Sequence, residues 1–538
     1  MRYILAAMGL LFALGINPAW GEVPGRTQLE GRLPLTLSDA IGLGLENNLA
    51  LEVDRFAPAL ADQDQWLAWS AYDPVFSGNG NYTREDPRLI ANRFQPPTGS
   101  GQFSRPVRIK GETTTGEAGI SALIPWLGAN LSIDYAANRN NDDQALRALS
   151  PEYTSSLEFG ANVPLLRGLV WNEPWTQVQT SGVSSQAALD SFAARVMDTV
   201  AEIERAYWNL IASREQLVVA RKSHDTSIAL LDQVETQYEV GVVSRVEVVE
   251  AEAGVAERDL TVIQTENTYR RAQDILIDLV LGSNLTVAST LEIEPLDAPA
   301  DYTIYAIDLD ALADRAFHRR PEIAAAERDI ERAELNLRFA KNLRLPQLDF
   351  QARYGVNDLE GGKVPAGGGE FPFPESRGTG GDFSDTLKGR FTGRRGSNYT
   401  FGAVVSIPIG NTRGRHSVSR AELELRLART RLLRLRQSIV LEVRDGARNL
   451  ESAQRGIKAA ERRTAASAEQ LRAERVRLEH GESTPFDVLQ RERDLVDAES
   501  QSIGALQLYR NSETELLRSQ GTILDSRNIV FEELVSLE

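Results

Sequence analysis

The chain of 538 residues contains no cysteine. It can therefore form no disulfide, and it offers no cysteine that could carry a lipid anchor. If the protein is held in a membrane, its fold has to provide the anchor.

Long apolar runs are also missing after residue 21. The best candidate, residues 275–287, is interrupted by Asp278 and Asn284, whereas a membrane-spanning helix needs about 20 predominantly apolar residues. A helical membrane protein is therefore disfavoured. The remaining options are an exported soluble protein and a β-barrel, which satisfies its backbone hydrogen bonds without helices.

The N-terminal segment differs from the rest of the chain. Arg2 precedes an apolar run over residues 3–16, and Ala19-Trp20-Gly21 has the small-x-small pattern of a cleavage site. The run is shorter than a membrane anchor requires. We predict a signal peptide at residues 1–21.

Signatures of common enzymes are absent as well. No P-loop, GxGxxG or GxSxG motif occurs, and the histidines lack metal-ligand spacing. The acidic and basic side chains on the predicted helices lie at salt-bridge spacing, as on solvated faces. The net charge of −17 disfavours nucleic acid, because phosphate repels an acidic chain. It leaves open whether the acidity serves solubility or lines a cation-attracting lumen. We expect no catalysis, cofactor, metal site or nucleic-acid partner.

What the sequence does contain is an internal duplication. The dipeptide Val163-Pro164 returns as Ile407-Pro408 at an offset of 244, and the segment after Pro74 returns after Pro346 at an offset of 272. A seven-residue ladder repeats at an offset of 240. Its members are Val196, Ile203, Leu210, Leu217, His224, Leu231 and Tyr238 in the first half, and Leu450, Ile457, Thr464, Leu471 and Leu478 in the second. A strict heptad predicts long helices wound around partners with a left-handed twist.

Each half is predicted to hold a helix, strands, one very long helix and a shorter helix. The predicted helices are Leu37–Ala71, Glu173–Glu239, Arg245–Leu281, Leu309–Leu345, Thr412–Leu478 and Pro485–Gln520. The predicted strands are Val75–Thr83, Gly119–Ile124, Ala129–Ala137, Ser155–Val163, Gln347–Val356 and Tyr399–Ile407. Polar loops are predicted at 84–115, 138–153 and 361–381, and a linker at 285–307. A helix over residues 173–239 would be roughly 100 Å long.

The strands predict an oligomer, because a few strands per chain leave open sheet edges that a closed barrel would remove. Five tryptophans lie beside the ends of the first strand region, as an aromatic belt at a membrane interface would require. They are Trp66, Trp69, Trp126, Trp171 and Trp175. Ordinary packing of aromatic side chains is the alternative explanation.

Three segments carry a resemblance to a known family. They are Leu35–Ile41 with Leu45–Asn48, the turn Tyr238–Gly241 with Val246–Ala251, and the second turn Leu478–Leu489. In their order and spacing they resemble the TolC family of outer-membrane efflux proteins, over nearly the whole mature chain. The resemblance implies a mainly α fold with a β-barrel portion. Three copies would form an α-helical barrel of long coiled-coil helices, continued by an outer-membrane β-barrel.

The resemblance also implies a domain plan and a function. The plan is a first repeat at 22–284, a linker or equatorial segment at 285–307, a second repeat at 308–520 and a C-terminal tail at 521–538. The implied function is a passive homotrimeric exit duct for small molecules or proteins, in a tripartite efflux pump or type I secretion system. Its partners would be a periplasmic adaptor, an inner-membrane transporter and outer-membrane lipid, in a Gram-negative bacterium and with a large periplasmic part. The alternatives are a periplasmic adaptor and a structural coiled-coil protein of the cell envelope.

Site residues follow from the same resemblance. The family's two ring aspartates at the periplasmic entrance fall on Asp487 and Gln490, and the first repeat offers Glu247 and Glu250 beside Arg245. A simple capping role for Asp487 is the alternative. The expected adaptor-contacting helix tips are Gly241, Val242, Gly481 and Glu482.

One feature departs from the family. Pro74 to Pro164 spans 90 residues, whereas Pro346 to Pro408 spans 62, so the first repeat carries 28 extra. The family implies four strands per chain. The extra residues have the length of a hairpin, which would either widen the barrel or form a plug or external loop.

Overall fold

We describe a computed structural model of the chain. The structure describes residues 30–91, 106–142, 149–282, 290–298, 307–363, 386 and 396–531. The predicted signal peptide and most of the predicted loop at 361–381 lie outside the described residues. The chain forms two compact units, each built from both halves of the sequence. The first comprises Met1–Phe56, Phe192–Pro321 and Arg436–Glu538, and the second Ala57–Ser191 and Glu322–Leu435.

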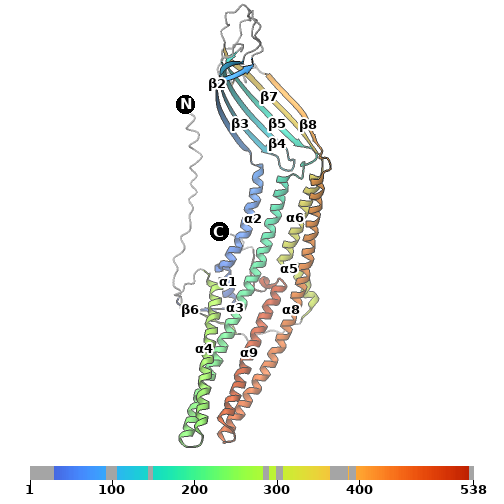
Figure 1. The fold of residues 1–538 in the computed structure, drawn as a ribbon. Coiled ribbons are helices and arrows are strands. Elements are labelled where there is room, and N and C mark those ends of the chain that lie inside the picture. Colours follow the sequence, from blue (N-terminus) through green and yellow to red (C-terminus); the bar gives the residue numbers. More distant parts are fainter. Residues whose placement is uncertain are drawn as a thin grey trace, which may run out of the picture. The chain divides into compact units, whose positions relative to one another are not determined.

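The described residues are mainly helical, with an antiparallel β portion (Figure 1). The helices are α1 (Leu37–Asn47), α2 (Leu49–Trp69), α3 (Glu173–Glu239), α4 (Arg245–Leu281), α5 (Leu309–Arg319), α6 (Pro321–Leu343), α8 (Thr412–Glu479), α9 (Pro485–Ser519) and α10 (Ile523–Ser526). The strands are β1 (Glu30–Leu35), β2 (Val75–Ala91), β3 (Pro106–Leu123), β4 (Asn130–Asp142), β5 (Leu149–Pro164), β6 (Thr290–Pro295), β7 (Gln347–Lys363) and β8 (Gly396–Ser406). Within this part of the chain, no helix is apolar over a stretch long enough to cross a membrane.

The two very long helices are confirmed, and their heptad ladders mark a buried side. α3 spans 67 residues and α8 spans 68. In α3, Val196, Ile203 and Leu210 are fully buried, and Leu450 and Ile457 of α8 are nearly so. Burial weakens toward the turn that follows α3, where Tyr238 is exposed.

Two predicted helices are each broken in the structure. The predicted helix at 37–71 is interrupted at Asn48, where the backbone is extended. The Asn48 side-chain oxygen accepts the N–H of Leu51 at 2.9 Å and so caps the start of α2. The predicted helix at 309–345 is interrupted at Arg320, which is also extended, because the following Pro321 disfavours helical backbone in the residue before it. The two breaks are 272 residues apart, so they occupy equivalent places in the duplication.

The first unit contains a large apolar core and a small parallel sheet. The core gathers α1, α3, α4 and α10 around fully buried side chains such as Ile203, Tyr207 and Leu276. β6 lies within the predicted linker at 285–307, which is therefore not merely a connection. It pairs in parallel with β1, and Ile293 of β6 is fully buried in the same core.

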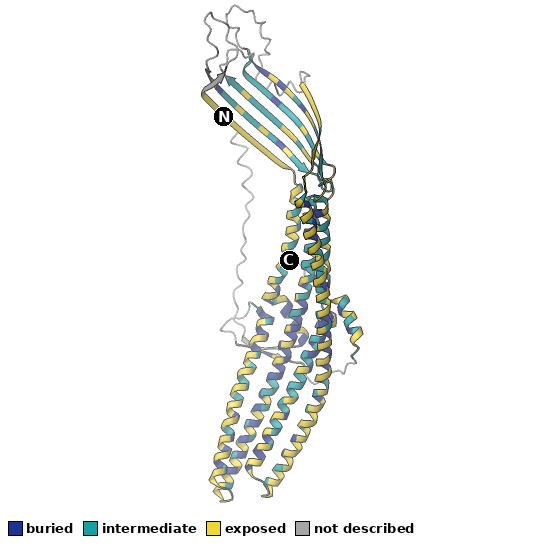
Figure 2. Ribbon diagram, turned by 45° about the vertical axis from the view of Figure 1, so that its right-hand side comes forward, coloured by how far each residue is buried: buried dark blue, intermediate teal, exposed yellow. Residues whose placement is uncertain are grey.

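The second unit contains a six-stranded antiparallel sheet in the order β2-β3-β4-β5-β7-β8. Its strands are longer than predicted. β2, β3, β4 and β5 extend into the predicted polar loops at 84–115 and 138–153, and β7 extends to Lys363. Residues 84–86, 110–117 and 138–142 of these extensions carry polar side chains or glycine on both faces, so they lack the alternation that indicates a strand in a sequence. Figure 2 shows the exposed edge strands: residues 75–86 of β2, and all of β8 but Gly402, are exposed.

Candidate functional site

The helix turns α3–α4 and α8–α9, both in the first unit, are built alike. Gly241 and Gly481 have φ values of 80° and 72°, a conformation that glycine adopts without a steric penalty. Val242 N–H donates to the Gln237 carbonyl and Glu482 N–H to the Arg477 carbonyl, both at 2.9 Å. With the Gly241 and Gly481 N–H bonds to Tyr238 and Leu478, these form two Schellman motifs.

The residue expected in the entrance ring, Asp487, takes part in a capping box at the start of α9. The Asp487 carboxylate accepts the Thr484 hydroxyl at 2.7 Å and the Thr484 N–H at 3.2 Å. In return, the Asp487 N–H donates to the Thr484 hydroxyl at 3.2 Å. Hydrogen bonds from the Thr484 hydroxyl, and then from its backbone N–H, lower the pKa of Asp487 below its ordinary value. Asp487 is fully exposed and ionised at neutral pH.

The first-repeat counterpart, Glu247, also lies three residues after a capping residue. Its carboxylate accepts the Ser244 N–H at 3.3 Å at the start of α4. Glu247 is half-buried, whereas the other predicted ring residues are exposed at the beginnings of α4 and α9. These are Arg245, Glu250 and Gln490.

The helix turns expose apolar side chains next to these charges. The residues are Val240, Val242, Val246, Val249 and Phe486, with exposed fractions from 50% to 73%. Gly241, Gly481 and Glu482 are exposed beside them. We call these five apolar residues the turn patch. An exposed apolar patch that is surrounded by polar groups is typical of an interaction surface.

Behind the turn patch, the two helical hairpins pack on each other. Val234 of α3, Val248 of α4, Leu471 of α8 and Val488 of α9 belong to one buried cluster. The turns therefore stand on a shared apolar base.

A buried ion pair lies further along α4 and α9, and it is not among the site residues expected from the sequence. Arg258 and Glu492 approach to 3.9 Å, with side chains only 7% and 5% exposed. Arg258 also donates to Ser223 Oγ and to the Gly254 carbonyl, both at 3.2 Å. Burial raises the pKa of Glu492, although nearby Arg258 and Arg475 oppose the shift. The sequence carries no sign that Arg258 and Glu492 pair, because each is a charged residue on a helix like many others in the chain.

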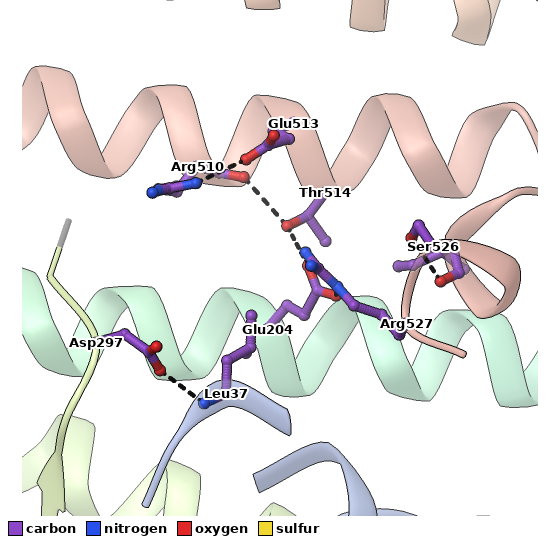
Figure 3. Close-up of polar contacts among 9 residues, drawn as sticks. Leu37, Glu204, Asp297, Arg510, Glu513, Thr514, Ser526 and Arg527 are labelled. Carbon is purple, nitrogen blue, oxygen red and sulfur yellow. Dashed lines mark hydrogen bonds and ion pairs between the residues drawn. The ribbon is translucent and has the colours of Figure 1, made fainter. Parts of the chain in front are cut away.

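A second buried polar cluster joins α3, α9 and the segment after α10 (Figure 3). Glu204 of α3 is fully buried and accepts Arg527 Nε at 2.5 Å and Nη2 at 3.1 Å. Thr514 of α9 donates to the same carboxylate at 2.7 Å. The charge of Glu204 is thus compensated by Arg527, and both Arg527 and Thr514 lie more than 300 positions later in the sequence. A glutamate directly after Ile203 in the heptad ladder was the available sequence signal.

The segment after β6 is held on α3 by a third set of contacts. Asp297 accepts the Leu37 N–H at 2.7 Å (Figure 3) and the Tyr207 hydroxyl at 2.6 Å. Burial, followed by the bond to Asp297, raises the pKa of the Tyr207 phenol. Tyr207 therefore stays a neutral donor throughout the physiological range.

In the part where β2 begins and β8 ends, the six-stranded sheet has one apolar face and one polar face. Directly paired residues form an apolar row across all six strands: Phe76, Ile120, Ile133, Phe159, Tyr354 and Tyr399. Each is at least 43% exposed. A neighbouring row on the same face runs Ala122, Leu131, Ala161, Ala352 and Phe401. We call these two rows the apolar band.

The opposite face of the sheet is polar at the same level. Between the two apolar rows, the row begins with Val75 on β2 and continues with Ser121, Ser132, Gly160, Arg353 and Thr400. The next row includes Asp134 paired with Glu158, and Arg353 lies 3.5 Å from Glu158. Alternation of this kind, with an apolar face exposed from edge to edge, suits a sheet that separates lipid from water.

The five predicted interface tryptophans lie in the second unit, beside the sheet. Three of them are partly buried in packing contacts. Trp69 and Trp175 meet edge-on with ring centroids 5.9 Å apart, and the Arg338 guanidinium lies 5.6 Å from the ring centroid of Trp171. Trp66 and Trp126 are more than 60% exposed. Three of the five therefore make packing contacts, and the interface role of all five stays a prediction.

These features define the class of protein. Paired long helices with an amphipathic sheet are the architecture of outer-membrane efflux channels, and the sequence matches the outer membrane efflux protein family over residues 118–280 and 312–522. The chain belongs to this family. It is an outer-membrane protein of an efflux channel family rather than of an enzyme family.

Individual relatives are distant. The chain is 22% identical to the outer membrane protein TolC of Vibrio cholerae over 406 residues, which cover 75% of this chain and 83% of that protein. The Campylobacter jejuni CmeC outer membrane channel matches with a TM-score of 0.62 and 14% identity, covering 93% and 89% of the two chains. The outer membrane protein VceC of Vibrio cholerae matches with a TM-score of 0.61 and 15% identity, covering 90% and 96%.

Proposed function

We propose that the protein is a passive, homotrimeric exit duct of a tripartite efflux pump or of a type I secretion system. Three sheets would close into a barrel in outer-membrane lipid, and the long helices would form the periplasmic part. The observation that carries the proposal is the apolar band, whose first row runs uninterrupted from edge to edge of the sheet. Exposing such a face to water would be costly, since burying apolar surface yields about 25 cal/mol per Å².

The partners follow from the helix turns. A periplasmic adaptor would bind the turn patch around Gly241, Val242, Gly481 and Glu482, and would link the duct to an inner-membrane transporter. The exposed valines of the patch support this proposal, because well-packed apolar contacts usually carry most of an interface's binding energy. We also propose the domain plan of two repeats, at 22–284 and 308–520, joined by the linker at 285–307.

The entrance is proposed to be lined by the exposed Asp487 and Gln490 of each copy, with Glu247, Glu250 and Arg245 nearby. Three copies of Asp487 would bring like charges together, and repulsion between them would be relieved by hydration or a bound cation. Trp66, Trp69, Trp126, Trp171 and Trp175 are the proposed interfacial aromatics, and Trp66 and Trp126 are the most exposed of them.

The proposal of a duct is tested by expressing the protein in cells from which its own gene has been deleted. Wild-type protein is expected to restore dye efflux and to fractionate with the outer membrane as a heat-modifiable trimer. The double variant Val242→Asp, Val246→Asp should assemble equally well but fail to restore efflux, because two charges disrupt the turn patch. Val218→Asp, at an exposed position on α3 away from the turns, is the matched control. Recovery of wild-type protein in the soluble periplasm would refute the proposal.

The ring assignment needs a variant that spares the capping box. Asp487→Asn keeps a side-chain oxygen that can accept from Thr484 but removes the charge, whereas Asp487→Ala removes both. If Asp487 lines the entrance, both variants should alter single-channel conductance and cation selectivity. An effect of the alanine variant alone would reduce Asp487 to a helix cap.

A further inference from the structure

The β3–β4 hairpin occupies the middle of the sheet. β3 pairs with β2 from Val75 to Ala91, and β4 pairs with β5 from Asn130 to Asn140. β2 and β5 are therefore separated by two full strands. The extra residues of the first half are thus part of the sheet rather than an appendage to it.

The hairpin shares the two-faced chemistry of its neighbours. Ile120 and Ile133 pair directly and continue the apolar row between Phe76 and Phe159. On the opposite face, Ser121 pairs with Ser132. A plug inside a water-filled channel would not need an apolar face aligned with that of the wall, whereas a strand of the wall does.

The first part of β2 and the whole of β8 are built without protection against pairing, whereas charged residues and Pro87 follow in the second part of β2. Residues 75–83 of β2 and the whole of β8 contain no charged residue and no proline. Within the described chain, neither strand has a partner on its outer side. Soluble proteins usually interrupt such edges with charges, prolines or short strands, because exposed backbone groups recruit other chains.

The two edges are also complementary in direction. The sheet has six strands, each antiparallel to the next, so β2 and β8 run in opposite directions. A β8 edge placed beside the β2 edge of a second copy would continue the antiparallel pattern. The occupant that fits each edge is therefore another copy of this chain.

We propose that all six strands form the barrel wall and that β8 of one copy pairs with β2 of the next, so that three copies close an 18-stranded barrel. The inference rests on the proposed trimeric duct and adds the number of strands and the seam between copies. Because barrel diameter grows roughly linearly with strand number, this barrel would be about 1.5 times as wide as one built without the hairpin.

The face opposite the apolar band would line the lumen. It carries Glu117, Asp134, Glu158 and Asp349 against Arg353. An excess of acidic groups on the wall of a water-filled channel favours cations. The barrel itself would then contribute to cation preference.

Disulfide trapping tests whether β8 of one copy lies beside β2 of the next. Because the chain has no native cysteine, the engineered thiols are the only ones present. Asn79→Cys in β2 is combined in turn with cysteine at Asn398, Thr400, Gly402 or Val404, which share its face. Tyr399→Cys and Phe401→Cys, on the opposite face, are the controls. One same-face pair is expected to convert most of the protein to covalent trimer, with weaker yields at its neighbours and none at the controls.

The outcomes separate this inference from the duct proposal. A native trimer without any β2–β8 disulfide, a disulfide within one chain, or a disulfide to a foreign protein would overturn the 18-stranded barrel and leave the duct intact. A native mass of a single chain would instead overturn the duct proposal itself.

A hairpin deletion gives a second, independent measurement. Joining Ala91 directly to Leu149 removes residues 92–148 and leaves four strands per chain. In cryo-electron microscopy of both proteins, the barrel of the variant is expected to have about two thirds of the wild-type diameter. Equal diameters would contradict the inference. If the variant does not assemble, a strand count on the wild-type barrel still decides between 18 and 12.

Discussion

The two halves of the chain agree in their helices and differ in their strands. α3 and α8 differ in length by one residue, and the turns after them are built from the same motifs at an offset of 240 residues. The sheet, in contrast, receives four strands from the first half and two from the second. The duplication has been kept in one part of the molecule and altered in the other.

The physical reason lies in how each element finds its partners. A residue inserted into a long heptad helix rotates every later side chain by about 100°, and so removes the apolar seam from its neighbours. A hairpin inserted into an antiparallel sheet brings its own hydrogen-bond partners and keeps the direction of every flanking strand. The length of the long helices is therefore constrained by their packing, whereas the number of strands in the sheet can change by two.

The largest predicted effect on stability concerns the segment after α9, which differs from the segment after α4 in the other half. After α4 the chain forms β6, whereas after α9 it forms α10 and places Arg527 on Glu204. Arg527→Ala would leave the buried Glu204 carboxylate with only Thr514, and we expect it to lower the free energy of unfolding by about 3–5 kcal/mol. Thermal melting followed by circular dichroism measures the loss.

The control for this prediction is an exposed ion pair between α5 and α10. Arg319 and Asp525 form an ion pair in which both side chains are 60% exposed. Arg319→Ala should cost less than about 1 kcal/mol, because water already solvates such a pair. Equal losses for the two variants would contradict the assignment of Glu204 as a buried determinant of stability.

A smaller effect is expected at the helix break of the first half. Asn48 caps α2 through Leu51 and also donates to the Leu279 carbonyl at 3.1 Å, whereas Arg320 at the second break pairs with Glu442 at 2.5 Å. Asn48→Ala should destabilise the protein by about 1–2 kcal/mol, and Asn48→Ser should recover part of the loss. The change Glu46→Ala, at an exposed position of α1, is expected to lie within about 0.5 kcal/mol of wild type and is the matched control in the melting experiment.

The smallest effect concerns the two capping carboxylates. The lowered pKa of Asp487 means that its ionised form stabilises the fold; this contribution is present above the ordinary value of 3.8 and is lost as the pH falls through the lowered pKa. Asp487→Ala should therefore lower the melting temperature at pH 7 more than at pH 2. Glu247→Ala is the corresponding change in the first half. A defect of Asp487→Ala that is the same at both pH values would rule out the carboxylate as its source.

The sequence predicted some elements well because their signal is local and periodic. The periodic pattern as a whole gave the start of α3 and α8 and, within one residue, their ends. It failed at Asn48, where no proline or glycine marks the break and the deciding contact is with Leu279. At Arg320 the following Pro321 was a local signal of the break.

The candidate sites divide in the same way. Gly241 and Gly481 could be read from the sequence, because a helix end with positive φ selects glycine. The Arg258–Glu492 and Glu204–Arg527 pairs join residues hundreds of positions apart, and each member alone resembles an ordinary surface charge. The extended strands could not be predicted, because their outer portions are polar on both faces and show no period of two.

By itself, the sequence determined the duplication, the long helices with their turns, and the membership of a family of outer-membrane efflux proteins, because each of these is encoded in local spacing. Only the tertiary structure decided where the extra hairpin lies and which rows cross the sheet. Strand neighbours are chosen by backbone hydrogen bonds that every residue but proline can make, so register emerges only when the strands are side by side.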